Sequence, residues 1–127
     1  MLLSKITLVV RDYDEAIAYF IGVLGFRLVE NTDMGGGKRW VMVSPGEGSA
    51  DILLAKGANE AQLARAGDQT GGRVAFFLDT DDFDRDHAAL LARGVNFLEA
   101  PREEAYGKVA VFADIYGNKW DLVQPKA

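Results

Sequence analysis

A strand-like segment near the N-terminus occurs twice, and this internal repeat constrains the fold more than any other feature of the sequence. Lys5–Asp12 has the sequence KITLVVRD, and Arg73–Thr80, 68 residues later, has the sequence RVAFFLDT. Each copy begins with a cation, continues as an apolar run and ends in an acidic turn ahead of a helical pattern. Repetition at a fixed offset indicates two copies of one structural unit. We therefore expect two similar modules.

The composition indicates one domain over residues 1–127, because 127 residues with 49% hydrophobic side chains can bury a substantial core. No apolar run approaches the roughly 18 residues of a membrane span, and the N-terminus lacks a signal-peptide pattern. We expect a cytoplasmic protein with no membrane partner. The net charge of -5 argues against nucleic-acid binding, since phosphates would be repelled. The absence of cysteine excludes disulfides, thiolate metal sites and cysteine nucleophiles.

The first module, about residues 4–56, begins with a β-branched strand at Lys5–Val10. Asp12 and Glu15 form a capping box that predicts a helix start, and Gly25 predicts its end. The apolar stripe of this helix is predicted to be Ile17, Phe20, Ile21 and Leu24. Three further strands are predicted at Phe26–Glu30, Arg39–Val43 and Asp51–Ala55, with a flexible glycine-rich loop at Asn31–Lys38.

The second module, about residues 73–124, repeats this order after a connector at 57–72 that contains a short helix capped by Asn59. Its helix has the predicted stripe Phe83, His87, Leu90 and Leu91. Its strands are predicted at Arg73–Leu78, Val95–Glu99, Lys108–Asp114 and Lys119–Gln124, with Trp120 and Leu122 facing the helices. The order β-α-β-β-β, given twice, fits neither a doubly wound parallel sheet nor an all-β sandwich.

Four short phrases resemble one protein superfamily. They are Leu24-Gly25-Phe26, Arg39-Trp40, Arg93-Gly94-Val95 and the run from Asp114 to Trp120. With the doubled β-α-β-β-β order, they resemble the glyoxalase/bleomycin-resistance/extradiol-dioxygenase superfamily, also called vicinal oxygen chelate proteins, over nearly the whole chain. The resemblance implies an α+β fold in which two tandem modules form a cup-shaped, eight-stranded mixed sheet, with helices outside and a ligand site within the cup. Many members are homodimers, so we expect a homodimer.

Metal-dependent members of this superfamily use histidine and glutamate ligands from the first and last strands of each module. By the resemblance, these positions fall on Lys5, Leu53, Arg73 and Asp121, and the two pairs share a separation of 68 residues. Lysine and arginine have no free lone pair at neutral pH and leucine has no donor atom, whereas a catalytic metal needs about three protein ligands. The only histidine, His87, lies on a helix and is interpreted as a packed side chain. We expect no metal and no other cofactor.

Alternation along the strands places residues i and i+2 on one face of a sheet. The predicted ligand-binding residues are Lys5, Thr7, Trp40, Leu53, Arg73, Phe77 and Asp121. Apolar walls with a few convergent charges are typical of small-molecule sites. Two interpretations stay open, because Lys5, Arg73 and Asp121 could form only a structural ion-pair cluster, or their surplus positive charge could bind an acidic group. Asp51 would cancel this surplus if it faced the same way.

Three functional classes follow from the resemblance and the residues. The first is a metal-free protein that binds or sequesters a small organic molecule, similar to the bleomycin-resistance branch. The second is a metal-dependent lyase, isomerase or dioxygenase with atypical ligands. The third is a metal-free enzyme with Asp121 as general base and Tyr106 or Tyr116 as acid, although neighbouring cations would lower the pKa of Asp121 and weaken that role. We favour the first class and leave catalysis open.

Overall fold

The computed structural model describes residues 1–127, which divide into two compact units, Met1–Gly67 and Asp68–Ala127. We call these unit 1 and unit 2 and describe each by itself. No helix in either unit combines the length and the apolar character needed to cross a membrane.

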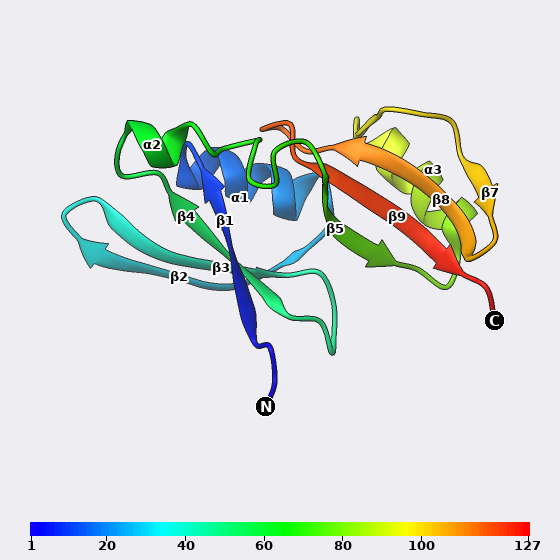
Figure 1. The fold of residues 1–127 in the computed structure, drawn as a ribbon. Helices are drawn as coiled ribbons and strands as arrows, with labels where there is room; N and C mark the ends of the chain where they lie inside the picture. The colour runs from blue at the N-terminus through cyan, green and yellow to red at the C-terminus, as the bar shows by residue number, and fades with distance from the viewer. The chain divides into compact units, whose positions relative to one another are not determined.

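Unit 1 is a four-stranded mixed sheet with one long helix (Figure 1). Its elements are β1 (Lys5–Val10), α1 (Tyr13–Gly22), β2 (Arg27–Gly35), β3 (Lys38–Ser44), β4 (Asp51–Lys56) and the short α2 (Glu60–Leu63). The strand order is β1-β4-β3-β2, with β1 parallel to β4 and the other pairs antiparallel. Helix α1 packs against β2, β3 and β4.

Unit 2 repeats this plan (Figure 1). Its elements are β5 (Val74–Asp79), α3 (Phe83–Ala92), β6 (Asn96–Phe97), β7 (Arg102–Glu104), β8 (Gly107–Ala113) and β9 (Lys119–Pro125). The strand order is β5-β9-β8-β6, β7 also pairs with β8, and β5 is parallel to β9 as β1 is to β4. The predicted α+β fold of two tandem modules is confirmed, although nine strands form two sheets where eight strands in one sheet were expected.

Both long helices begin at an aspartate, as was predicted for Asp12. The Asp12 side chain accepts a hydrogen bond from the Glu15 backbone N–H at 2.9 Å, and Asp82 accepts one from the Arg85 N–H at 3.1 Å. Each bond satisfies one of the donors that a helix start leaves unpaired. The repeat therefore includes the capping chemistry that terminates each first strand and starts each helix.

The predicted buried stripe of α1 is partly wrong. The buried residues of this helix are Tyr13, Ala16, Tyr19 and Phe20, whereas Ile17 and Ile21 are only half-buried. A stripe drawn through isoleucine, leucine and phenylalanine omits tyrosine, which can bury its ring and keep its hydroxyl hydrogen-bonded. Here the Tyr13 hydroxyl accepts a hydrogen bond from the Arg39 N–H at 3.1 Å, so this ring links the helix to β3.

Two strand predictions also need correction. Residues 31–38 are not a loop, because β2 continues to Gly35 and β3 begins at Lys38. Gly36 and Gly37 form the turn between them with φ values of 63° and 83°, which glycine adopts without steric cost. The short strand β7 was not predicted, since its sequence Arg-Glu-Glu shows no apolar alternation. Pairing with the edge of β8 makes it a strand.

A buried turn between β8 and β9 sets the position of β9. The Asp114 carboxylate accepts hydrogen bonds from the N–H groups of Tyr116 and Asn118, from the Asn118 amide and from the Trp120 indole, all between 2.9 and 3.0 Å. Trp120 is 1% exposed and packs between the rings of Phe76 and Phe112. The prediction that Trp120 lies in the core is confirmed, and the next residue of β9 must therefore face the opposite side of the sheet.

Candidate functional site

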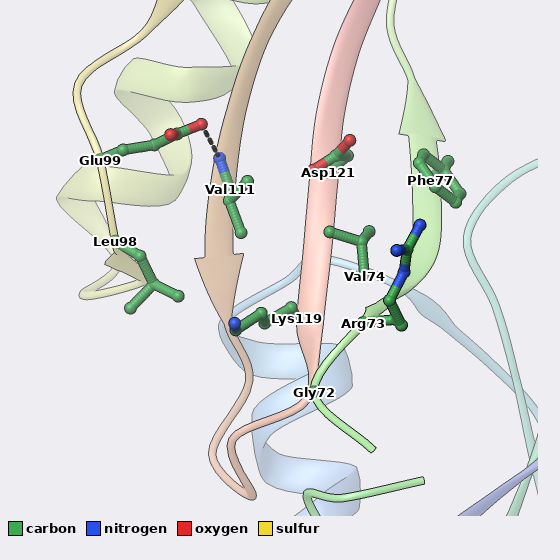
Figure 2. A pocket seen from close by; sticks show the side chains of 9 residues that line it. All are labelled: Gly72, Arg73, Val74, Phe77, Leu98, Glu99, Val111, Lys119 and Asp121. Carbon is green, nitrogen blue, oxygen red and sulfur yellow. Dashed lines mark hydrogen bonds between the residues drawn. The ribbon is translucent and has the colours of Figure 1, made fainter. Parts of the chain in front are cut away.

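Unit 2 has a pocket of about 520 Å³ on one face of its sheet (Figure 2). Its walls are formed by β5, β8 and β9, by the segment before β5 and by the segment after β6. The lining residues are Gly72, Arg73, Val74, Phe77, Leu98, Glu99, Val111, Lys119 and Asp121. This size is within the usual range of small-molecule sites.

Strand register explains why these side chains meet. Asp121 on the central strand β9 pairs with Phe77 of β5 on one side and with Val111 of β8 on the other. Directly paired residues share a face, and Lys119 joins them because it precedes Asp121 by two positions. The opposite face of β9 is occupied by Trp120 and by α3, so the pocket face is left without a covering helix in unit 2.

Asp121 is the buried polar group of this pocket. The residue is 7% exposed, and its Oδ1 atom has no hydrogen-bond partner. Burial raises the pKa of the Asp121 carboxyl above its ordinary value; the Arg102 charge opposes this shift, and the Glu99 charge adds to it. The sequence-based expectation that adjacent cations lower this pKa is therefore wrong.

The charged side chains near Asp121 form their hydrogen bonds and ion pairs with groups other than Asp121. Glu99 Oε1 accepts hydrogen bonds from the Val111 N–H at 3.2 Å and from Arg102 Nε at 3.1 Å, and Arg102 also pairs with Glu104. Within unit 2, no ion pair joins Arg73 and Asp121, two of the three members of the ion-pair cluster that was one of the two open interpretations. Glu99 is thus fixed by its own partners, while Asp121 Oδ1 is left without a hydrogen-bond partner.

Two cations lie at one end of the pocket. Arg73 precedes β5 and Lys119 begins β9, and both are exposed. Figure 2 shows them near Gly72, with Asp121 and Glu99 farther along the strands and the Arg73 side chain extending in the direction of Phe77. The pocket therefore has a cationic end, apolar walls and a buried carboxyl group.

The remaining predicted site residues lie in unit 1. Thr7 pairs with Leu53, and Leu53 pairs with Met42 on β3, so the alternate residues Lys5 and Trp40 share that sheet face. The other face contains the buried residues Leu8, Val10, Val41, Val43, Ile52 and Leu54. Asp51 pairs with Lys5 and therefore shares its face, which offsets the positive charge of Lys5 in unit 1.

Structure thus places Lys5, Thr7, Trp40 and Leu53 on one face of unit 1, and Arg73, Phe77 and Asp121 in the pocket of unit 2. Sequence reasoning missed six lining residues: Gly72, Val74, Leu98, Glu99, Val111 and Lys119. The alternation that selected Asp121 also selects Lys119, so that residue could have been found. Glu99 lies after the two-residue strand β6, where no periodic pattern indicates direction.

The pairing register between the first and last strands differs between the two units. Leu53 pairs with Thr7 in unit 1, but Asp121 pairs with Phe77 in unit 2, two residues beyond the position that a separation of 68 predicts. One residue of this shift is already present where Val74 pairs with Lys119, and an irregularity between Val74 and Phe76 in the β5–β9 pairing adds the second. The full shift of two residues brings the large ring of Phe77, rather than Ala75, beside Asp121.

The donor atoms of this chain do not fit the superfamily's catalytic metal. Among the four expected ligand positions only Asp121 has a suitable donor, and no group of three or more His, Asp or Glu side chains could bind a metal ion. His87 packs between the rings of Phe83 and Phe97, at centroid distances of 5.3 and 4.4 Å. This contact agrees with the interpretation of His87 as a packed residue of α3.

A family model provides the decisive comparison, since it matches residues 2–122 and is described as the Glyoxalase/Bleomycin resistance protein/Dioxygenase superfamily. The chain belongs to this superfamily. The resemblance inferred from the sequence motifs is thereby confirmed over almost the whole chain.

Individual relatives in this superfamily include an uncharacterized protein of Shewanella frigidimarina (strain NCIMB 400), which is 49% identical over 121 residues, covering 94% of this chain and 90% of the relative. Among solved structures, UcmS2 is 28% identical with a TM-score of 0.83, and the match covers 97% of both chains. TnmS3, an antibiotic binding protein from Streptomyces sp. CB03234, is 28% identical with a TM-score of 0.79, covering 99% of this chain and 97% of that chain.

Proposed function

We propose that this superfamily member binds a small organic molecule without a metal, in the unit 2 pocket, and sequesters it rather than transforming it. The observation that supports this most strongly is the pocket itself, in which apolar walls surround a buried carboxyl whose Oδ1 has no protein partner. The donor set that does not fit a metal also supports it, as does the likeness to TnmS3, an antibiotic binding protein.

An acidic group on the ligand is part of this proposal. Arg73 and Lys119 line the same end of the pocket, and neither is paired with Glu99 or Asp121. A guanidinium can bind a carboxylate through two parallel hydrogen bonds, and a lysine ammonium adds a point charge. The ligand's acidic group would lie against Arg73, with its apolar body along Phe77 and Val111.

The test is a calorimetric screen of small aromatic and aliphatic acids, beginning with cinnamate, against the wild type and Arg73→Ala. Since Arg73 is exposed, we expect its loss to weaken cinnamate binding about three- to tenfold, not more. Glu103→Gln is the matched control, because Glu103 is exposed on β7 and does not line the pocket. Equal affinities of wild type and Arg73→Ala would contradict the acidic-group proposal.

A metal-free enzyme is the second candidate, and one observation favours it. The raised pKa of Asp121 brings this carboxyl closer to the range in which a general base or acid works near neutral pH. Recovery of each bound acid unchanged after prolonged incubation supports binding alone. Wild-type conversion of a bound compound that Asp121→Asn abolishes would instead support the enzyme.

We further propose that residues 1–127 act as one functional domain, as a homodimer in the cytoplasm. The dimer is supported by the superfamily and by β2, an edge strand whose Leu28, Val29 and Met34 are exposed. Light scattering after size-exclusion chromatography should give twice the chain mass of 13.8 kDa. A monomer at micromolar concentration would contradict the dimer.

A further inference from the structure

Asp121 is a buried acceptor that the protein leaves unsatisfied. Its Oδ1 atom is buried without a hydrogen-bond partner, although the residue itself lines the pocket. Such an oxygen costs free energy unless water or a ligand supplies a donor. We infer that Asp121 determines specificity by binding a neutral hydrogen-bond donor of the ligand, so that the ligand is an apolar acid bearing a hydroxyl group. This inference rests on the proposed function.

The donor must be neutral because of the charges at the other end of the pocket. Arg73 and Lys119 would repel a ligand ammonium group, whereas they favour an acidic group. A hydroxyl suits both states of Asp121, since it donates to the carboxylate and accepts from the protonated acid.

The pocket walls next to Asp121 indicate the chemistry of the part of the ligand that joins its acidic group to its hydroxyl group. Phe77 pairs with Asp121 on one side and is 65% exposed, while Val111 pairs with it on the other. Leu98, which is 49% exposed, adds a further apolar surface. A ligand that displaces water from this carboxyl without replacing its hydrogen bond loses affinity. An apolar body of this kind therefore needs a hydroxyl at the end near Asp121.

The test compares three probes of one shape: p-hydroxycinnamate, p-methoxycinnamate and cinnamate. Calorimetry with the wild type should show p-hydroxycinnamate binding about tenfold more tightly than p-methoxycinnamate, in which the donor is methylated. In Asp121→Leu the ratio should fall to about one, while cinnamate still binds. Glu103→Gln should keep the wild-type ratio, because this exposed residue lies outside the pocket.

Asp121→Asn keeps the test decisive if Asp121→Leu does not fold. Its amide oxygen accepts a hydrogen bond without charge, so the ratio should fall at least about threefold from the wild-type value. An unchanged ratio in either Asp121 variant overturns the inference. Equal wild-type affinities for all three probes overturn the inference and leave the proposed function standing. Failure of all three to bind overturns both.

Discussion

Asp114 and Asp121 show how two aspartates seven positions apart can serve opposite purposes. Asp114 accepts four hydrogen bonds and forms the turn that begins β9, whereas Asp121 Oδ1 accepts none. A buried, unpaired carboxyl reduces stability, and sites that bind ligands commonly retain such groups. The sequence predicted where Asp121 faces, through its alternation with Trp120, but it could not predict that Asp121 is unpaired. That depends on Arg102 pairing with Glu99 and Glu104.

Asp121→Asn should stabilise the free protein at neutral pH. Because the folded pKa is raised, the native state binds protons more tightly than the unfolded chain, and stability falls as pH rises from the ordinary value near 3.8 through the raised value. Asparagine does not ionise, so the variant does not lose this stability as the pH rises. The charged groups that line the pocket with Asp121 are Arg73, Glu99 and Lys119, and Arg102 of β7 also acts on it.

Thermal melts from pH 4 to pH 8 measure this effect. The melting temperature of Asp121→Asn should exceed that of the wild type at pH 8, and the difference should shrink toward the acidic end. A variant that is less stable than the wild type at pH 8 would show that the carboxylate has a stabilising partner, which contradicts its unpaired state.

Asp114→Ala should destabilise the protein by about 3 kcal/mol, because four buried donors lose one charged acceptor. Urea unfolding followed by tryptophan fluorescence measures the change. Asp84→Ala is the control, since Asp84 is exposed and pairs only at the surface with Lys108. Equal midpoints for the two variants would mean that the turn contributes nothing to β9.

At the scale of elements, the sequence predicted what local chemistry determines. The helix cap at Asp12 and the strand β1 were expected where they occur. Strands that form only by pairing with a neighbouring strand were not predicted. The strand β7 requires the edge of β8, and the end of β2 requires its hairpin with β3. The irregularity in β5–β9 pairing likewise has no local signal, yet it moves the partner of Asp121 by one residue, to Phe77.

Gly107 gives a prediction at this scale, because it begins β8 at a φ of 151° and closely approaches the backbone of β9. A Cβ atom added there would lie 2.2 Å from the Gln124 carbonyl oxygen. Gly107→Ala should therefore cost about 3 kcal/mol of unfolding free energy, because backbone atoms cannot move aside as side chains can.

Gly46→Ala is the matched control for this variant. A Cβ at Gly46 meets no atom within 4 Å, and its φ is not positive. Urea midpoints should shift strongly for Gly107→Ala and by less than about 0.5 kcal/mol for Gly46→Ala. Similar small shifts in both would show that β8 and β9 separate easily at this end.

At the scale of the whole molecule, the 68-residue repeat predicted the β-α-β-β-β order of both units apart from the additional strand β7, because each copy contains its own strand and helix signals. The two copies differ in the side chains on the sheet face away from the long helix. Unit 1 has Lys5 offset by Asp51, whereas unit 2 has Arg73 and Lys119 with a buried carboxyl. The ligand binding that we propose for unit 2 rests on this difference, which the family fold alone does not specify.

The most direct test of metal-free binding is the affinity of chelator-treated protein for p-hydroxycinnamate, measured beside protein supplied with Zn²⁺, Ni²⁺, Mn²⁺ or Fe²⁺. The account predicts the same affinity in every sample and recovery of the compound unchanged. Binding or turnover that appears only with one metal, bound near one ion per chain, would contradict the account and require ligands other than those found at Lys5, Leu53, Arg73 and Asp121.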